Sequence, residues 1–393
     1  MVVLFIAYQE LSDPLMLSQG LPYIEGLINK QNTFILLTYE KNTNKITPPL
    51  KSLGITWYIH RYHSKPRLFA TIYDILVGIL STLRILRIHP VKLIHARGFI
   101  PAIIGCLPAR LNRTPLFFDT RGFLADKYVG GGLLKRRSVA YKIMKVAEYF
   151  FLKWVPALSV ETRCHKEILA SKYPRYKEKI AVIPCCVDTE RFNFIKKGDR
   201  DILKRYGISE GVVFSYLGKL STWYLIKEML DFYEIARTFF KKSFFIFLTQ
   251  DAPEFLHIPN FFKNEIVTIR PNYEDIPRLL ASSDVGIFFI NPYRRYNSCP
   301  VKYGEYLASG LPVVINSGIG DCDKIVRARR LGVVVEEFTP TNYTKAASEL
   351  RQLLQEGLTL RKRCRQAATE LLSLRDGIEK YSKIYKQLMD AKG

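Results

Sequence analysis

The stretch SDVGIFFINPYRRYNSCPVKYGEYLASGLPVVINSGIGD occupies residues 283–321 and contains the parts of one α/β unit. Its run VGIFFI (285–290) is short and apolar, which is typical of a buried strand. A polar loop follows, then a segment of helical period over 301–309, a Gly-Leu-Pro turn and a second strand in 312–316. This order places a helix N-terminus at the carboxyl end of a parallel strand, where free N–H groups and the helix dipole favour a phosphate.

Two charged side chains of this stretch suit a nucleotide. Lys302 adds a full positive charge beside the helix start, and Glu305, one turn further on, can accept hydrogen bonds from a ribose diol. The stretch therefore predicts a site for both the phosphates and the sugar hydroxyls of a nucleotide. The alternative is that Glu305 is an ordinary exposed acid on a helix surface.

The rest of the chain repeats the alternation of short apolar runs with longer segments of helical period. Such alternation predicts parallel sheets covered by helices on both faces. At 393 residues, of which 48% are hydrophobic and 24% charged, the chain is globular and exceeds the usual size of one core. A polar segment near residues 190 to 200 separates the runs into two groups. The expected strands are 2–8, 33–39, 54–60, 92–96, 115–119, 157–161 and 180–184, then 212–218, 244–250, 265–270, 285–290, 312–317 and 332–337.

The pattern P-x-K-x-x-E-Y-L-A-x-G-L-P-V-V at 300–314 resembles the donor-binding signature of GT-B glycosyltransferases, in particular those of retaining family 4. The resemblance implies two Rossmann-like domains with parallel sheets facing across a cleft, and a C-terminal helix that crosses back to the first domain. Residues 1–192 would bind the acceptor, 193–370 would bind a nucleotide-sugar donor, and 371–393 would form the returning helix. No separate cofactor is implied, because the donor is itself a substrate.

In that family two glutamates, separated by seven residues, bracket the donor, and the second binds the ribose. Glu305 occupies the second position, but Asn297 stands at the first, which leaves the sugar contact in question. Asn can still donate to and accept from a hydroxyl. The resemblance further implies that one backbone segment faces the diphosphate and the sugar: Ser298, Cys299, Pro300, Val301 and Lys302.

A second match is VVFSYLGKLSTWYLIKEML at 212–230, which resembles the strand and loop that open the family's second domain. Gly218 allows the backbone to approach a ligand closely. The family commonly places one basic residue after this glycine and another some six residues later, both reaching the diphosphate. Lys219 fits the first position and Tyr224 stands at the second. The resemblance therefore implies Lys219 and Lys302 as the pair that neutralises the leaving group, with an exposed surface lysine as the alternative for Lys219.

Polar residues also follow two expected strands of the first half. His95, Arg97, Asp119 and Arg121 lie at or just beyond strand ends, where we expect them to contact the acceptor. An arginine there can bind phosphate or a carboxylate through two hydrogen bonds. Two alternatives remain open: Asp119 as the partner of a structural ion pair, and His95 as an interior side chain. Asp126, expected on a loop, is our candidate for orienting the attacking hydroxyl, a task for which the leaving phosphate is the alternative.

The formal charge of +23 calls for a polyanionic partner. Residues 1–190 hold 27 basic and 13 acidic residues, and the segments 71–92 and 131–158 combine basic with apolar side chains. Such helices can lie on an anionic membrane surface, although they can equally cover the first sheet, and both can hold at once. We expect no nucleic-acid partner, since no nucleic-acid-binding motif is found. We also expect no membrane-spanning helix, because such a helix needs about 18 apolar residues and no stretch is expected to reach that length.

The seven cysteines are odd in number and lack a CxxC pair, which favours neither a disulfide framework nor a zinc site and fits a reducing cytoplasm. Without an Asp-x-Asp motif in the donor region, we expect no metal ion. The function expected is a glycosyltransferase of cell-surface glycan synthesis that uses a saccharide or lipid-linked acceptor, in the cytoplasm or on the inner face of the membrane. Two alternatives remain: a nucleotide-sugar epimerase or hydrolase of the same fold, and a non-catalytic sugar-nucleotide-binding protein.

Overall fold

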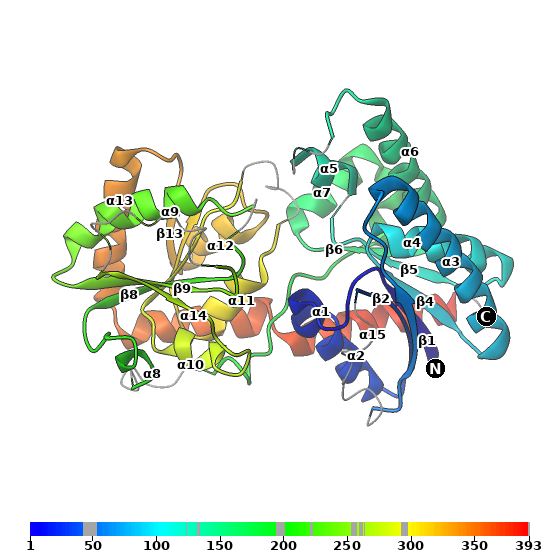
Figure 1. Cartoon of the computed structure of the whole chain (residues 1–393), viewed down its shortest axis with the longest axis horizontal. Helices are drawn as coiled ribbons and strands as arrows, with labels where there is room; N and C mark the ends of the chain where they lie inside the picture. Colours follow the sequence, from blue (N-terminus) through cyan, green and yellow to red (C-terminus); the bar gives the residue numbers. More distant parts are fainter. Residues whose placement is uncertain are drawn as a thin grey trace. The chain divides into compact units, whose positions relative to one another are not determined.

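A computed structural model describes residues 1–41, 53–122, 124–130, 132, 134–193, 201–220, 223–252, 258, 262, 264–291 and 298–391 (Figure 1). The chain divides into two compact units. The first unit comprises Met1–Pro184 and Leu374–Gly393, and the second comprises Cys185–Ser373. Each has its own sheet, as the alternation of strands and helices predicts.

The first unit is built on a seven-stranded parallel sheet of order β3-β2-β1-β4-β5-β6-β7. Its central strands are buried along almost their whole length, because helices cover both faces of the sheet. The seven strands are β1 (Val2–Ala7), β2 (Thr33–Glu40), β3 (Thr56–Arg61), β4 (Leu93–Arg97), β5 (Leu116–Asp119), β6 (Ala157–Val160) and β7 (Ile180–Val182).

The helices of this unit form two layers, since the strand order reverses direction after β3 and crossovers between parallel strands are right-handed as a rule. One layer contains α1 (Pro14–Gln19), α2 (Leu21–Ile28) and α15 (Leu374–Asp390). The other contains α3 (Arg67–Ile88), α4 (Phe99–Leu111), α5 (Leu124–Gly130), α6 (Val139–Trp154) and α7 (Arg163–Lys172), with a short 3-10 helix at Pro174–Lys179. Side-chain caps fix several starts: Asp13 accepts from the Leu15 amide, Ser138 from that of Tyr141, and Thr162 from that of His165.

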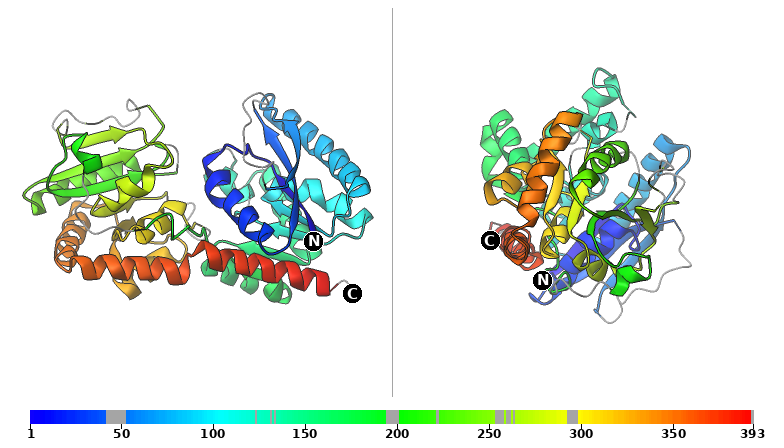
Figure 2. Two further views of the ribbon diagram at one scale, coloured as in Figure 1. Left: turned by 90° about the horizontal axis from the view of Figure 1, so that it is seen from below. Right: turned by 90° about the vertical axis from the view of Figure 1, so that its left-hand side faces the viewer.

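The last helix returns to the first unit, which confirms the expectation for the C-terminal segment. α15 lies along α2 (Figures 1 and 2), where Gly26 allows a close approach. A Cβ atom added at Gly26 would lie 2.1 Å from Cδ1 of Ile378. The rings of Tyr23 and Tyr381 meet edge to face at 5.2 Å between centroids. These contacts bring the tyrosines of α15 to the sheet.

The expectation that no segment is long and apolar enough to span a membrane is wrong. Leu68–Ile88, within α3, has 21 residues and a mean hydropathy of 1.7, and only 28% of its most apolar window is buried. The segment meets the criterion for a membrane-spanning helix by length and composition only. In the sequence, α3 connects β3 to β4 of one sheet. Its Asp74 is buried and accepts from the Tyr8 hydroxyl at 2.7 Å and pairs with Nδ1 of His63 at 2.6 Å. In this fold α3 is a covering helix of the sheet.

The second unit contains a six-stranded parallel sheet of order β10-β9-β8-β11-β12-β13. The strands are β8 (Val212–Leu217), β9 (Ser243–Leu248), β10 (Ile266–Ile269), β11 (Val285–Phe288), β12 (Val313–Asn316) and β13 (Gly332–Val335). The helices are α8 (Asp201–Lys204), α9 (Ile226–Ala236), α10 (Ile276–Ala281), α11 (Val301–Ala308), α12 (Cys322–Arg329), α13 (Pro340–Leu354) and α14 (Leu358–Leu371), with a 3-10 helix at Arg237–Phe239. All thirteen strands expected from the sequence are thus present in the two sheets.

Candidate functional site

Lys302 lies in the first turn of α11, where the second unit buries it almost completely, at 6% exposure. Its Nζ atom has no hydrogen-bond partner in the described part of the chain. Two aromatic rings face it instead, with centroids 3.4 Å away for Tyr224 and 4.0 Å away for Tyr216. Rings stabilise an ammonium through their quadrupole but accept no ordinary hydrogen bond. The amine therefore keeps its capacity to bind an anion.

Backbone and hydroxyl contacts fix these rings in place. The Tyr216 hydroxyl donates to the Lys219 carbonyl, and the next residue, Leu217, donates its amide to the Tyr306 hydroxyl on α11 at 2.8 Å. Beyond β8 the chain forms an antiparallel bridge between Tyr224 and Ile290, next to β11. The family resemblance implies a second basic residue at the position of Tyr224, and in this structure the Tyr224 ring lies against Lys302 instead. The ring supports the charge of Lys302 without adding a second charge.

Gly218, directly after β8, lies next to the same ammonium. Its φ of +127° lies in the region that favours glycine, and an added Cβ would lie 3.0 Å from Lys302 Nζ. The structure therefore brings Gly218 and Lys302 together across 84 residues of sequence. Lys219 is exposed; its carbonyl accepts from the Tyr216 hydroxyl at 2.6 Å, which fixes the loop without engaging the lysine side chain.

The start of α11 offers backbone donors beside the amine. Pro300 precedes the helix in an extended conformation and no side chain caps it. The amides of Val301 and Lys302 have no acceptor among the residues that the structure describes. Ser298 and Cys299 are buried just before the helix. Asn297, expected near the transferred sugar, lies outside the described residues.

Glu305 is buried one turn along α11 from Lys302. Burial raises the pKa of Glu305 to about 7, although the charges of Lys302 and Arg191 act in the opposite direction. Burial likewise holds the pKa of Lys302 well below its usual range, against the charge of Glu305. Their mutual attraction thus fails to offset the cost of desolvation. A ligand that brings a negative charge to Lys302 and hydroxyl donors to Glu305 would stabilise both charged forms.

Two further residues lie near Glu305, Arg191 and Tyr273, and neither was predicted from the sequence. The guanidinium of Arg191 lies 3.5 Å from the centroid of the Tyr273 ring and donates to the Tyr273 carbonyl at 2.6 Å. The charge of Arg191 acts on Glu305 and on Tyr273. The sequence gives no signal that pairs these two residues, because they are 82 residues apart.

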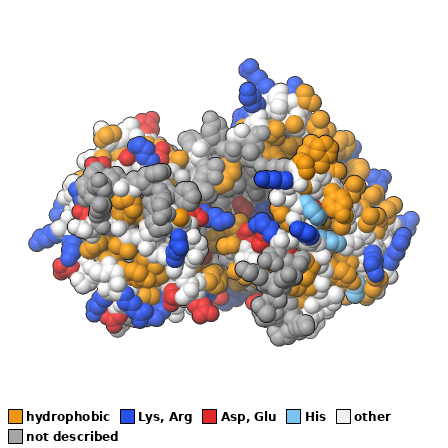
Figure 3. Space-filling model, in the orientation of Figure 1, with side chains coloured by type: hydrophobic (Ala, Val, Ile, Leu, Met, Phe, Trp, Pro, Cys, Tyr) orange, Lys and Arg blue, Asp and Glu red, His pale blue; other side chains and the backbone are white. Residues whose placement is uncertain are grey.

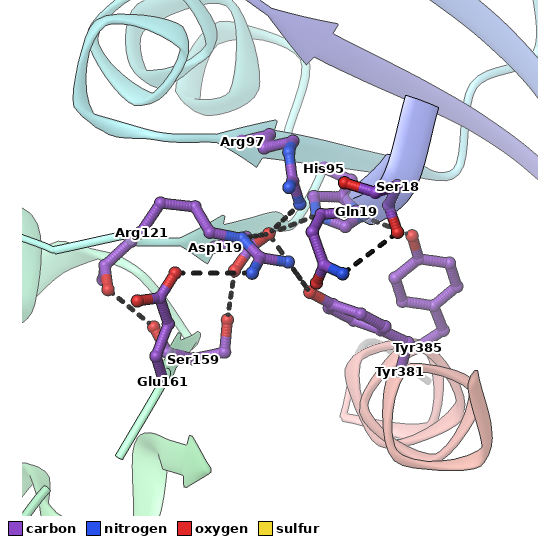
Figure 4. Close-up of polar contacts among 11 residues, drawn as sticks. Ser18, Gln19, His95, Arg97, Asp119, Arg121, Ser159, Glu161, Tyr381 and Tyr385 are labelled. Atoms are coloured by element: carbon purple, nitrogen blue, oxygen red, sulfur yellow. Dashed lines mark hydrogen bonds and ion pairs between the residues drawn. The ribbon is translucent and has the colours of Figure 1, made fainter. Parts of the chain in front are cut away.

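In the first unit, the residues expected to contact an acceptor form a buried cluster around Asp119 (Figure 4). Asp119 Oδ2 accepts from Arg97 at 3.0 Å, from Nε of Arg121 at 2.9 Å and from the Tyr381 hydroxyl at 3.1 Å. Its Oδ1 accepts from the Ser159 hydroxyl at 2.8 Å. Both oxygens of the carboxylate are therefore occupied.

The charges of this cluster are mutually compensated. Burial alone would raise the pKa of Asp119, but the charge of Arg121, contact with His95 and the charge of Arg97 hold it well below its usual range. Arg121 also has a φ of 44°, in the left-handed region that non-glycine residues rarely adopt, and donates to the Tyr381 hydroxyl at 3.0 Å. The side-chain contacts hold this strained backbone in place.

His95 is an interior residue of the same cluster, at 2% exposure. Its Nδ1 lies 2.6 Å from the Tyr385 hydroxyl, while Nε2 lies 3.7 Å from Asp119 Oδ2, beyond hydrogen-bond distance. Burial lowers the pKa of His95. The structure thus brings His95, Arg97, Asp119 and Arg121 together as expected, but as an ion-pair cluster with few polar atoms left to bind an acceptor. An acceptor contact by these four residues stays a prediction.

Asp126 was expected on a loop, and this expectation is wrong, because it lies in the first turn of α5. Its two oxygens accept from the Tyr141 hydroxyl at 3.0 Å and from Lys145 Nζ at 2.8 Å, both on α6. These bonds tie α5 to α6. A role for Asp126 toward an acceptor hydroxyl would require one of them to break.

Two family models match the sequence. Residues 29–191 match the model described as Glycosyltransferase Family 4, and residues 216–355 match the one described as Glycosyl transferases group 1. The two matches fall in the first and the second unit, apart from the last residues of the first match. No curated protein sequence matches the chain.

Solved structures with a similar fold span both units. A glycosyltransferase from Rickettsia africae has a TM-score of 0.74 and 17% identity, with 99% of this chain and 98% of that chain covered. Sucrose-phosphate synthase from Thermosynechococcus elongatus has a TM-score of 0.74 and 13% identity, with 99% of each chain covered. HepE from Anabaena, in complex with UDP-glucose, has a TM-score of 0.69 and 14% identity, with 98% and 100% covered. With two glycosyltransferase domains on this architecture, the chain is a glycosyltransferase of the GT-B fold.

Proposed function

We propose that the chain transfers a hexose-type sugar from a nucleoside-diphosphate sugar to a saccharide or lipid-linked saccharide during synthesis of a cell-surface glycan. The observation that carries this proposal is the buried, unpartnered amine of Lys302, which lies beside Gly218 and the free amides of α11. A diphosphate supplies the negative charge that this arrangement lacks. HepE is recorded with UDP and with UDP-glucose, so UDP-sugars are the first donors to test.

The chemistry proposed is transfer with retention of configuration and without a metal ion. The bond between the anomeric carbon and the diphosphate breaks, and the acceptor oxygen forms a bond to that carbon on the same face. Lys302, Lys219 and the helix amides would neutralise the departing diphosphate, which also takes the proton of the acceptor hydroxyl. Stabilising this developing charge is the main contribution that the second unit can make to catalysis.

Glu305 would bind the ribose of the donor. Its carboxylate can accept hydrogen bonds from both hydroxyls of the diol, and it lies on the same side of α11 as Lys302, one turn away. Arg191 and Tyr273 lie near enough to Glu305 to interact electrostatically with it and would neighbour the nucleoside. Contacts to the acceptor are proposed for the first unit.

The direct test is a thermal-shift screen of the full chain against UDP-, GDP-, ADP- and dTDP-sugars, followed by transfer assays with the donor that binds. We expect one base to raise the melting temperature, and Lys302→Ala to remove both that shift and most turnover while leaving the folded structure intact. Unchanged turnover in Lys302→Ala would refute the assignment of the diphosphate site.

The products distinguish transfer from the two alternatives. Incubation with donor alone should give little free sugar and no epimer, whereas an epimerase or hydrolase needs no acceptor. A non-catalytic binding protein would show a thermal shift but no transfer across a broad panel of acceptors. Either result would replace the proposed reaction while keeping the donor site.

We also propose that the protein acts in the cytoplasm, on the inner face of the membrane. The seven cysteines are odd in number and lack a CxxC pair, which suits a reducing compartment. Localisation of the tagged protein by fractionation of cells into cytosol and membranes tests this proposal.

A further inference from the structure

The exposed apolar side chains of this protein are concentrated on three helices. Of the twenty large hydrophobic side chains exposed in the described part of the chain, fourteen lie on α3, α4 and α6. The most exposed reach 72% for Phe69 and Val139, 69% for Leu68, 67% for Leu80 and 64% for Leu111. A concentration of this kind marks a surface that is covered in use.

The three helices are neighbours on one face of the seven-stranded sheet. α3 packs against α4, and α4 contacts α6 through the rings of Phe99 and Phe151, at 5.3 Å between centroids. At the other end of α4, the guanidinium of Arg110 lies 4.8 Å from the centroid of the Trp154 ring, in the same last turn of α6 as Phe151. The exposed side chains therefore form one continuous surface, which we call the α3-α4-α6 face. Figure 3 shows hydrophobic side chains spread over the part of the unit where these helices lie, with basic side chains among and around them.

The exposed charges of the α3-α4-α6 face have one sign. The only acids in the three helices are Asp74 and Glu148, and both are buried, at 1% and 2% exposure. Asp74 is held by Tyr8 and His63, and Glu148 by Lys145 and the Ala125 amide. The exposed charged side chains are all basic: Arg84, Arg87, Arg110, Lys142 and Lys153.

We propose that the α3-α4-α6 face docks on an anionic lipid bilayer, with its helices lying in the plane of the membrane surface. Charge complementarity selects this partner, because apolar side chains flanked only by basic ones suit the boundary between acyl chains and anionic headgroups. Aromatic Trp154 and Tyr73 suit the same boundary, since each has an apolar ring and a polar group. The proposal does not rest on the transfer reaction and requires no donor.

The fold explains why α3 lies on the membrane instead of crossing it. Insertion across a bilayer would remove α3 from between β3 and β4 and would break the contacts of Asp74 with Tyr8 and His63. It would also leave the other exposed helices in water. Docking in the plane covers all three helices at once and keeps the sheet intact.

The test is flotation of the full chain with vesicles of phosphatidylcholine alone or containing phosphatidylglycerol, at low and at high salt. We expect binding to the anionic vesicles at least about tenfold stronger than to the neutral ones, and weaker at high salt. Arg87→Glu with Lys142→Glu should reduce this binding by at least about 25-fold, since each basic residue near the surface contributes about fivefold. The matched control, Lys241→Glu with Lys362→Glu, makes the same change in net charge off the face and should bind within about threefold of the wild type.

A second pair of variants tests the apolar contribution. Phe69→Ser with Ile143→Ser should weaken binding by about tenfold, whereas Tyr206→Ser with Leu358→Ser, at exposed sites in the second unit, should not. Circular dichroism establishes that all four variants fold. Failure of the wild type to bind anionic vesicles at low salt, or equal losses in the face and control variants, would overturn the proposal. A dimer in lipid-free solution that Phe69→Ser with Ile143→Ser dissolves would also overturn it, in favour of a second copy as the occupant.

Discussion

Asp119 in the first unit and Lys302 in the second are both charged side chains that the fold buries, at 3% and 6% exposure, but their surroundings are opposite. Asp119 receives four hydrogen bonds, two of them from arginines, and its pKa lies well below the usual range. Lys302 donates none within the described residues, and burial keeps its pKa well below the usual range, so that its charged form is disfavoured.

The difference separates a structural charge from a binding charge. A buried charge whose partners belong to the protein contributes to the fold and has little left to offer a ligand. A buried amine without a partner costs folding free energy, and a ligand that supplies the missing charge recovers it. The variants below test this contrast. Replacing Asp119 should mainly lower stability, whereas replacing Lys302 should mainly lower affinity for the ligand.

The largest expected effect is loss of stability in Asp119→Asn. Removing the carboxylate charge takes the ion-pair partner from buried Arg97 and the nearer of two carboxylates from Arg121, which also pairs with Glu161 at 3.4 Å. This should lower the free energy of unfolding of the first unit by about 3–5 kcal/mol. Urea unfolding followed by tryptophan fluorescence measures the change. Asp126→Asn is the matched control, because its carboxylate is paired but half-exposed, and should cost about 1 kcal/mol or less. A loss in Asp119→Asn no larger than in this control would show that the cluster is not structural.

Lys302→Met should have the opposite pair of effects. Methionine keeps an unbranched apolar side chain against Tyr216 and Tyr224 but removes the amine, so affinity for the nucleoside diphosphate should fall by about 1.5–3 kcal/mol, or roughly 10- to 150-fold. The melting temperature without ligand should stay the same or rise, because an unpaired buried polar group is gone. Calorimetric titration and thermal unfolding measure the two effects.

Lys219→Met is the control for that experiment, since it removes an exposed lysine from the adjacent loop. It should change stability little and affinity less than Lys302→Met does. Wild-type affinity in Lys302→Met, or a fall in its ligand-free stability, would place Lys302 with Asp119 among the structural charges.

Gly218→Ala should disturb the donor side at a smaller cost. The methyl group would lie 3.0 Å from Lys302 Nζ at a φ of +127°, so we expect about 1–3 kcal/mol of destabilisation together with weaker nucleotide binding. Gly207→Ala separates strain from contact, because Gly207 also has a positive φ, +77°, but an added Cβ there meets nothing within 4 Å. Equal effects on nucleotide affinity in the two variants would remove Gly218 from the site.

The donor side could be predicted from the sequence because its residues lie in two short motifs. The order of strand, loop and helix in 283–321 already places Lys302 at a helix start, and a glycine after an apolar run already places Gly218 at a strand end. What the motifs cannot contain is the contact between them. The aromatic rings around Lys302, and the pair Arg191 and Tyr273, depend on distant segments that meet only after folding.

The first unit shows where the same reasoning stops. Polar residues at strand ends were correctly predicted to lie together, but the sequence does not say whether they face solvent or one another. Tyr381 is hydrogen-bonded to Asp119, and Tyr385 to His95. Both tyrosines come from a helix more than 250 residues further along the chain. Burial of this cluster is therefore decided by α15, which no local pattern around Asp119 reveals.

The smallest effect concerns the pH dependence of Glu305. Because its pKa is raised to about 7, the carboxyl is mostly protonated below that pH and mostly ionised above it. The folded state therefore holds the proton of Glu305 more tightly than the unfolded chain, in which its pKa is near 4.5. In the ligand-free protein, the free energy of unfolding should fall as pH rises from about 4.5 to about 7. A ribose diol binds better to the ionised form, so affinity for a nucleoside without phosphates should fall by up to about tenfold between about pH 8 and about pH 6.

Comparison of nucleoside with nucleoside diphosphate separates the two buried groups. Burial favours the neutral form of Lys302 and a bound diphosphate favours the charged form, so Lys302→Met should weaken binding of the diphosphate and leave binding of the nucleoside unchanged. Glu305→Gln should abolish the pH dependence for the nucleoside, because the amide does not titrate. Equal losses of affinity for the two ligands in Lys302→Met would mean that Lys302 does not contact the phosphates and is, like Asp119, a structural charge.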